Sequence, residues 1–184
     1  MSYEITTKRI NKELIETFDY LDTVFDFSDG LRQSRLNENE WSINEILEHI
    51  TLTSHFLLIT LKQSLTKVLR RSKESSIPEN NSNLEKIIVV GDPDAFDWIR
   101  PEHMQPTGKI SHLEVRSKMQ VQKAECLEIL SQIKQGEGNL HRVSMSVQDL
   151  GKLNMYEWMY FLIQHAKRHC VEIDRIIKIN QPKN

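Results

Sequence analysis

Two histidines near the end of the chain have the spacing with which a single helix can bind a metal ion. His165 and His169 lie four residues apart, in the pattern H-x-x-x-H. Successive residues of an α-helix are rotated by about 100°, so these two positions lie one turn apart on one face. On a helical projection His169 lies roughly 20° and His165 roughly 60° from Leu162, within the apolar arc of the segment. Two imidazoles placed in this way are able to bind one divalent ion together.

A third histidine has a matching position in another predicted helix. His49 lies roughly 60° from Ile46, at the flank of the apolar arc, whereas His55 lies roughly 180° away and is expected to face solvent. We therefore predict a metal site formed by His49, His165 and His169. Three imidazoles leave at least one coordination position for water, which is typical of a reactive metal site and not of a closed structural one. The alternative is that these histidines are packing residues with hydrogen-bond partners in the core.

Two glutamates are weaker candidates for a catalytic role. Glu45 lies one helical turn before His49, and Glu172 follows His169 by three residues. Either carboxylate is a candidate general base, or an acceptor for the ring N–H of a histidine ligand. Glu45 is also explained by a helix cap, and we prefer that interpretation. Ala166 occupies the place of the glutamate in the zincin motif H-E-x-x-H, so the zincin interpretation fails.

Three further histidines are given structural roles. His112 faces the apolar stripe near the start of the third predicted helix and is a candidate fourth ligand, but packing near the helix cap is preferred. His103 and His141 lie in predicted loops near prolines or glycines, and we expect both at the surface.

Four segments with helical apolar periodicity would position these residues. Their predicted boundaries are about 3–28, 42–70, 111–135 and 154–179. Three of these helices begin with Ser or Asn followed three residues later by Glu, which is the pattern of a capping box. The three pairs are Ser42 with Glu45, Ser111 with Glu114, and Asn154 with Glu157. We expect Asp29-Gly30 to end the first helix. The pattern predicts an all-α protein, a four-helix bundle that forms a single domain over residues 1–184.

A long connection, about residues 72–109, separates the second and third predicted helices. It contains four prolines and one apolar patch, Ile87–Val90. Connections of this length inside a domain usually have a function or cover another part of the protein. The alternative is a flexible strap along the bundle, in which case the second and third helices need not be antiparallel.

The composition excludes several classes of function. The 184 residues include 24 Lys and Arg against 26 Asp and Glu, a net charge of −2, which provides no basic field for nucleic-acid binding. No apolar run approaches the ~20 residues that span a bilayer, and the charged N-terminal segment lacks the apolar stretch of a signal peptide. Cys126 and Cys170 belong to no C-x-x-C pair and are expected to be free thiols in a reducing cytoplasm. We therefore expect a cytoplasmic protein that binds neither nucleic acid nor membranes.

Two motifs that contain the three histidines resemble those of a known family. Residues 41–49, WSINEILEH, and residues 161–169, FLIQHAKRH, resemble the DinB/YfiT-like superfamily of bacterial four-helix proteins. Residues 100–108 and 150–158 are also similar, so the resemblance extends over about residues 1–180.

The resemblance implies a metal site and an architecture. In that family one histidine of the second helix and two of the last helix bind a divalent ion, often nickel or zinc, and the matching residues here are His49, His165 and His169. We expect zinc or nickel, although iron and manganese also suit such a site. The resemblance further implies a long crossover between helices two and three and, commonly, a homodimer.

The resemblance leaves the reaction open. Characterised relatives include thiol-dependent S-transferases and isomerases that use low-molecular-weight thiols, and others are described as hydrolases. We therefore expect a metal-dependent hydrolase or thiol transferase that acts on a small molecule. The alternative is a non-catalytic, stress-related scaffold or dimerisation module in which the metal or the histidines only stabilise the bundle.

Overall fold

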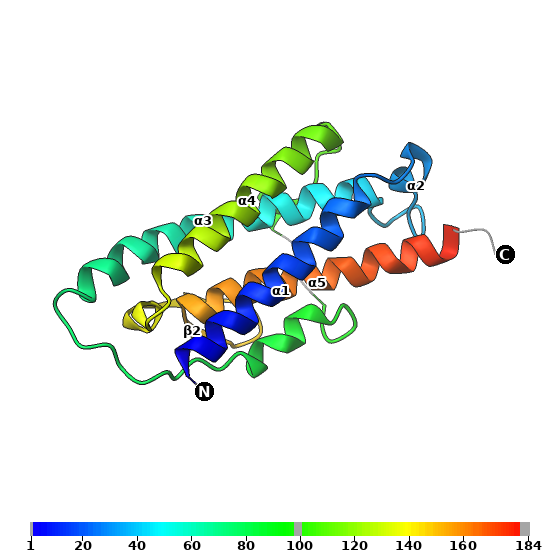
Figure 1. Cartoon of the computed structure of the whole chain (residues 1–184). Coiled ribbons are helices and arrows are strands. Elements are labelled where there is room, and N and C mark those ends of the chain that lie inside the picture. Colours follow the sequence, from blue (N-terminus) through cyan, green and yellow to red (C-terminus); the bar gives the residue numbers. More distant parts are fainter. Residues whose placement is uncertain (1, 98–100, 181–184) are drawn as a thin grey trace.

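Four long helices form most of the protein, shown in a computed structural model (Figure 1). They are α1 (Tyr3–Val24), α3 (Ile43–Arg71), α4 (His112–Gln132) and α5 (Met155–Asn180). The structure describes residues 2–97 and 101–180. Arg100, which belongs to one of the motifs above, and the extreme ends of the predicted 1–184 domain lie outside the described residues. The expectation of a mostly helical chain is confirmed.

The four long helices pack in pairs around a common apolar core. α3 contacts both α4 and α5, and α1 contacts the same two helices from the other side. Gln122 of α4 donates to the Thr51 carbonyl at 2.9 Å, and Lys62 of α3 donates to Glu125 of α4 at 2.7 Å. Both partners advance along the chain from the first contact to the second, so α3 and α4 run in the same direction.

The predicted first helix is too long at its C-terminal end. α1 ends at Val24, and a separate short helix, α2 (Asp29–Gln33), follows it. Asp29-Gly30 therefore begins α2 instead of ending α1. The reason is Arg32, a buried residue that the prediction did not consider: its guanidinium donates to the carbonyls of Phe25 and Phe27, which follow the end of α1. These bonds replace the helical ones that would have continued α1.

The predicted helix starts agree with the structure, although one cap is only half formed. The capping box of Ser42 and Glu45 is complete at the start of α3. Asn154 and Glu157 likewise bond reciprocally to each other's backbone N–H at the start of α5. At α4 the Ser111 hydroxyl accepts from the Glu114 N–H, but the Glu114 carboxylate pairs with Lys118 instead.

The long connection contains two 3₁₀ helices, η1 (Glu85–Gly91) and η2 (Glu102–Met104). Within the predicted apolar patch Ile87 and Val90 are buried, whereas Ile88 and Val89 are about two-fifths exposed. Gly91 approaches α5 so closely that an added Cβ would lie 2.5 Å from the Gln164 side chain. η1 therefore packs directly on α5 and fixes the middle of the connection.

A small β-hairpin before α5 was not predicted. Its strands are β1 (Arg142–Met145) and β2 (Gly151–Asn154), which pair antiparallel, and a 3₁₀ helix, η3 (Glu137–Leu140), precedes them. The turn between the strands has positive φ at Gln148 and Asp149, and so does Gly151, the first residue of β2. The hairpin brings Asn154 to the position from which it caps α5.

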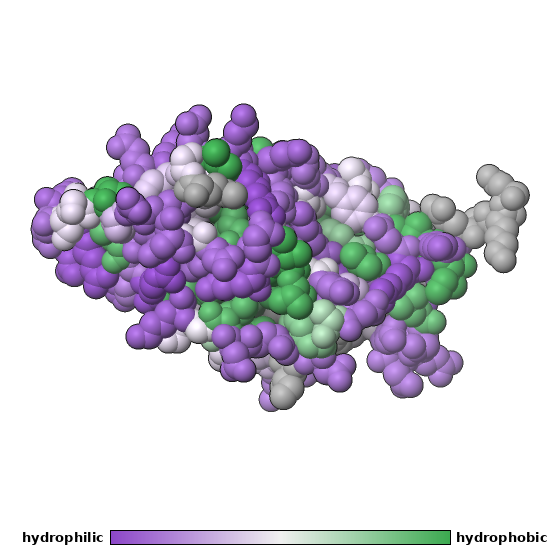
Figure 2. Space-filling view, turned by 90° about the horizontal axis from the view of Figure 1, so that it is seen from below, coloured by the Kyte–Doolittle hydropathy of each residue, from purple (hydrophilic) through white to green (hydrophobic). Residues whose placement is uncertain are grey.

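The surface is mostly polar. Figure 2 shows hydrophilic side chains over most of one face, with apolar side chains gathered near its middle. None of the helices in the described residues combines the length and apolar character that crossing a bilayer requires.

Candidate metal centre

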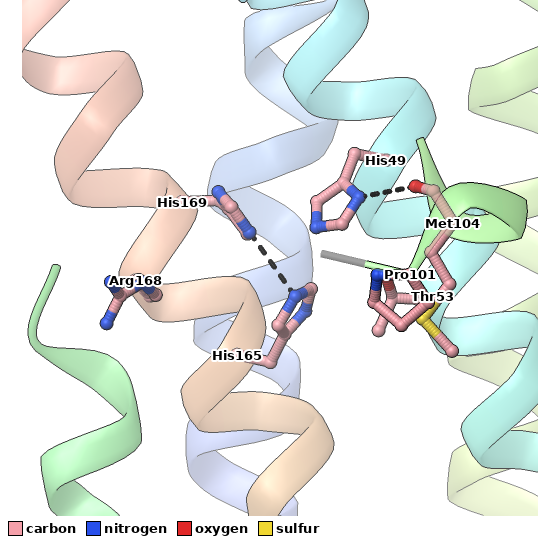
Figure 3. A pocket seen from close by; sticks show the side chains of 7 residues that line it. All are labelled: His49, Thr53, Pro101, Met104, His165, Arg168 and His169. Carbon is pink, nitrogen blue, oxygen red and sulfur yellow. Dashed lines mark hydrogen bonds between the residues drawn. The ribbon is translucent and has the colours of Figure 1, made fainter. Parts of the chain in front are cut away.

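The structure brings together the three histidines that the helical projection selected. His49 lies on α3, and His165 and His169 lie one turn apart on α5. One ring nitrogen of each lies within 4.8 Å of the others, and no residue of the three is more than 4% exposed. Figure 3 shows the rings converging between the two helices. Among residues 2–97 and 101–180 this is the only group of three or more potential ligands so arranged.

The ring of His49 is held in one tautomer by the long connection. Its Nδ1 lies 2.6 Å from the carbonyl oxygen of Met104, in η2 (Figure 3). A carbonyl oxygen only accepts hydrogen bonds, so we assign the proton to Nδ1. The Nε2 atom of His49 then presents a lone pair, which is the form in which an imidazole binds a metal.

The ring of His169 is held in the same tautomer by a carboxylate. Its Nδ1 lies 2.8 Å from Glu172 Oε2, one turn further along α5. A carboxylate is an acceptor, so Nδ1 carries the proton and Nε2 has the lone pair. Glu172 therefore occupies the position of the acceptor that commonly orients a histidine ligand.

The spacing of the two α5 imidazoles fits a shared cation. The Nε2 atoms of His165 and His169 lie 3.3 Å apart. Two nitrogens that each lie 2.0–2.1 Å from one ion are separated by about 2.8–3.4 Å for octahedral to tetrahedral angles. The alternative is a hydrogen bond donated by a proton on His165 Nε2. The lone pair on His169 Nε2 suits both arrangements, whereas the third lone pair, on His49 in the same cluster, favours the cation.

A small cavity adjoins the three rings and contains one unpartnered hydroxyl. The cavity has a volume of about 30 Å³, and its other lining residues are Thr53, Pro101, Met104 and Arg168. Thr53 is only 5% exposed, and its Oγ1 has no hydrogen-bond partner in the described part of the chain. A buried polar atom of this kind usually has a partner. A small polar ligand beside the histidines would supply one.

A larger cavity of about 310 Å³ lies next to residues that contact the cluster. It contacts the cluster through Trp41, whose ring centroid lies 4.7 Å from that of His49, and through Glu172. Leu36, Ile46 and Ile176 form apolar parts of its wall. Its volume lies at the lower end of the range for small-molecule sites, whereas the 30 Å³ cavity admits only a reacting group.

The other predicted residues lie away from the three rings. His55 and His103 are exposed, and each makes a ring contact with Phe56. His112 begins α4 and lines a separate cavity with Glu45, so it does not join the cluster as a fourth ligand.

The cap interpretation of Glu45 is confirmed, whereas His141 is less exposed than expected. Glu45 serves as the cap of α3: burial raises its pKa, but bonds from the Ser42 hydroxyl and backbone outweigh this effect and leave the pKa below its usual value. His141 is half-buried, contrary to the surface position expected for it. Burial, followed by the charges of Lys67 and Arg71, lowers its pKa.

Sequence reasoning missed two buried charged residues, each next to a histidine of the cluster. Glu48 accepts hydrogen bonds from Thr107 and Gly108, and Arg168 donates to the carbonyls of Asp92, Pro93 and Phe96. Both side chains thus fasten the long connection next to the site. The sequence signal for both is a charged residue directly beside a histidine that is predicted to be buried. An analysis of apolar periodicity alone overlooks this signal, because it expects charged residues to be exposed.

A family model for the DinB superfamily matches residues 13–173. The chain belongs to the DinB superfamily. This confirms the resemblance found in the sequence, and the match includes all three clustered histidines. Neither a curated protein nor a solved structure matches this DinB-like chain significantly. A metal-binding role is compatible with the family and the three-histidine cluster, and the reaction must be argued from the site itself.

Proposed function

We propose that this DinB-like protein is a metal-dependent enzyme in which His49, His165 and His169 hold one divalent ion. The observation that carries the proposal is the convergence of three buried imidazoles within 4.8 Å. Three ligands leave the coordination shell open, as in catalytic zinc sites. Zinc or nickel is the proposed ion, and iron or manganese also suits the donors. The architecture proposed with it is a single-domain four-helix bundle with a crossover between α3 and α4.

The chain's own residues prepare the site for this role. Met104 and Glu172 accept the Nδ1 protons of His49 and His169, which directs both Nε2 lone pairs toward the centre of the cluster. When bound, a divalent ion would supply a Lewis acid that lowers the pKa of a coordinated water or thiol. The Thr53 hydroxyl is placed to hydrogen bond with the small group that enters the cavity. Burial of the three rings and of Thr53 keeps bulk water away and strengthens their electrostatic interactions.

The proposed reaction is hydrolysis or thiol transfer on a small molecule. Only a water molecule, a thiol group or a part of similar size fits the 30 Å³ cavity. We propose that the body of the substrate, or of a low-molecular-weight thiol, lies in the neighbouring 310 Å³ cavity against Trp41. Glu172 contacts both this cavity and His169. It is therefore a better candidate than Glu45 for an acid–base group, because Glu45 is engaged in the helix cap. A homodimer is proposed on family resemblance alone.

The first test is metal content in protein purified without a nickel column. We expect close to one equivalent of zinc or nickel by mass spectrometry, and loss of that metal in His49→Ala. The matched control is His55→Ala, which removes an exposed histidine from the same helix and should retain the metal. Metal-free wild-type protein that also fails to bind added zinc would overturn the proposal.

The second test separates an enzyme from a scaffold. The loaded protein is assayed for thiol conjugation to electrophiles and for ester or amide hydrolysis, with and without EDTA. We expect turnover that EDTA abolishes and that Thr53→Val lowers without changing the metal content. A large fall in melting temperature on chelation, with no turnover on either substrate panel, would support the scaffold alternative instead.

A further inference from the structure

Glu48 is a buried carboxylate whose hydrogen bonds in the described residues all come from the long connection. Its Oε1 accepts from the Thr107 backbone N–H and hydroxyl, both at 2.8 Å, and its Oε2 accepts from the Gly108 N–H at 2.9 Å. The residue is 3% exposed. Three donors on two oxygens suit the ionised carboxylate, and hydrogen bonds to a charged acceptor are about twice as strong as neutral ones. Glu48 therefore fastens residues 107–108 to α3.

The same piece of the connection supports the candidate metal centre. Met104 lies three residues before Thr107, and its carbonyl accepts the Nδ1 proton of His49. His49 is the residue that follows Glu48 on α3. The adjacent residues Glu48 and His49 thus both bind to the short segment of residues 104–108. Glu48 holds Thr107 and Gly108 in place. The Met104 carbonyl of the same segment can then orient the His49 ring.

We propose that Glu48 is the positioning residue for His49: by holding residues 107–108 it places the Met104 carbonyl so that the His49 ring keeps its proton on Nδ1. The tautomer leaves a lone pair on His49 Nε2, and that this lone pair binds the ion rests on the proposed function. Glu48 itself does not contact the ion. The inference makes a separate claim about the protein without metal, namely that Glu48 sets the His49 tautomer.

The chain offers a matched control at the other end of the connection. Glu157 is also a buried carboxylate, 1% exposed, and accepts from the Asn83 and Asn154 backbone N–H groups, both at 2.9 Å. Asn83 belongs to the start of the connection, as Thr107 belongs to its end. Glu157 lies more than two helical turns before His165 on α5 and contacts none of the three histidines in the described residues. Glu48→Gln and Glu157→Gln therefore make the same chemical change, but only the first lies beside the site.

The first experiment reads the His49 tautomer in metal-free protein. Long-range ¹H–¹⁵N correlation spectra distinguish imidazoles protonated at Nδ1 from those protonated at Nε2. We expect the Nδ1–H form of His49 in wild type and in Glu157→Gln, and a mixture of both tautomers in Glu48→Gln. An unchanged His49 tautomer in a folded Glu48→Gln protein would overturn the inference, whether or not the protein binds a metal.

The second experiment measures zinc affinity by competition with a chromophoric chelator. Removing an outer partner of a metal ligand typically weakens binding by about 10–100-fold, and we expect a decrease near the lower value in Glu48→Gln. Glu157→Gln should bind zinc as wild type does. Wild-type affinity in Glu48→Gln would overturn the inference, whereas absence of zinc binding in wild type would overturn the proposed function and leave the tautomer experiment to decide.

A third variant keeps the inference falsifiable if Glu48→Gln does not fold. Thr107→Val removes one of the three bonds to Glu48 at an exposed residue and leaves the carboxylate in place. We expect it to shift the His49 tautomer and the zinc affinity in the same direction as Glu48→Gln, by a smaller amount. If Thr107→Val and wild type agree in both measurements while Glu48→Gln is unfolded, Glu48 has only a structural role and the inference is wrong.

Discussion

The two ends of the long connection between α3 and α4 are fastened in the same way but have different surroundings. At its start Asn83 donates to Glu157, beside the β1–β2 hairpin, and we call this region the hairpin end. At its finish Thr107 and Gly108 donate to Glu48, beside the three histidines, and we call this region the histidine end. Each end relies on a buried carboxylate that accepts backbone N–H groups. A buried carboxylate alone therefore does not mark a functional site.

The two ends differ in the charges around the carboxylate. At the hairpin end Lys86 and Arg142 each lie 3.3 Å from Glu157, so the buried negative charge is balanced by cations. At the histidine end Glu48 has no ion pair among the described residues, and the three imidazoles, the Thr53 hydroxyl without a partner there and a small cavity adjoin the same part of the connection through Pro101 and Met104. Satisfied networks of the first kind add stability, whereas incompletely satisfied buried groups are typical of sites that bind a ligand. This difference supports the proposal that the functional site lies at the histidine end.

The largest expected effect on stability is at the hairpin end. Glu157→Ala removes the acceptor of two backbone N–H groups and leaves Lys86 and Arg142 without their buried partner. Removing one member of such a network costs about 3 kcal/mol of unfolding free energy. Urea unfolding followed by circular dichroism measures this loss. The comparison also predicts that the folded variant binds zinc with wild-type affinity.

An ion pair outside both ends supplies the control for this prediction. Glu125→Ala breaks the pair with Lys62, whose side chain is half exposed, and should change stability by less than about 1 kcal/mol. If Glu157→Ala loses no more stability than Glu125→Ala, the hairpin end is not the stabilising region. If it weakens zinc binding more than Glu48→Gln does, the functional contrast between the two ends is wrong.

A smaller loss of stability, accompanied by a loss of metal affinity, is expected from Arg168→Met. The Arg168 guanidinium donates to the carbonyls of Asp92, Pro93 and Phe96 at 2.5, 2.9 and 3.0 Å, and it stacks on the Phe96 ring. Methionine retains the packing volume but donates no hydrogen bonds. The unfolding free energy should fall by about 2 kcal/mol, because buried carbonyls lose charged donors. Arg168 also lines the cavity beside His169, so zinc affinity should fall as well.

Arg168→Met separates two views of the histidine end. If Arg168 supports the ion site, added zinc should stabilise wild type more than Arg168→Met, since stabilisation by a ligand that binds only the folded state falls as its dissociation constant rises. The difference in melting temperature between the two proteins should therefore widen when zinc is added. Thermal unfolding with and without zinc tests this expectation. Equal shifts in the absence and presence of zinc, with unchanged affinity, would show that Arg168 fastens the connection without any link to the site.

Local sequence rules predicted the helices well because their signals are local. The starts of α3, α4 and α5 follow from caps that involve residues three positions apart, and periodicity located their buried faces. The end of α1 could not be predicted in this way, because it depends on Arg32 bonding back to carbonyls beyond the helix. The β1–β2 hairpin was missed for a similar reason: its short strands are defined by pairing with each other and by a turn with positive φ.

The three histidines of the candidate site could be predicted from the sequence, but most of the residues that support them could not. Helical projection and the family motifs chose His49, His165 and His169, because ligands on helices inherit the helical period. Glu48 and Arg168 escaped, since their partners lie in the long connection, about sixty to eighty residues away in the sequence. Helical periodicity relates residues of one helix, so it cannot predict a contact between a helix and the irregular connection. Glu172 was identified as a candidate because it lies on the same helix as His169.

The smallest expected effect concerns the pH dependence of stability at the hairpin end. Burial, and then the charges of Lys67 and Arg71, lower the pKa of His141 below its ordinary value of 6.5. In the unfolded chain the histidine takes up a proton near pH 6.5, whereas in the folded protein it does so only at lower pH. The unfolded state therefore binds more protons between these two values. The contribution of His141 to stability is present above about pH 6.5 and is lost as the pH falls toward the folded-state pKa.

His141→Gln tests this sign without disturbing the histidine end. Glutamine offers a neutral acceptor to Arg71, which lies 3.4 Å from the His141 ring nitrogen, and it does not titrate. The unfolding free energy of wild type minus that of His141→Gln should decrease between about pH 7.5 and pH 5.5, measured by urea unfolding in metal-free protein. The two proteins share all their other titratable groups, so the effect of those groups cancels in the difference. A difference that stays constant or grows as the pH falls would contradict the lowered pKa of His141. The surroundings of His141 at the hairpin end would then not disfavour its protonated form.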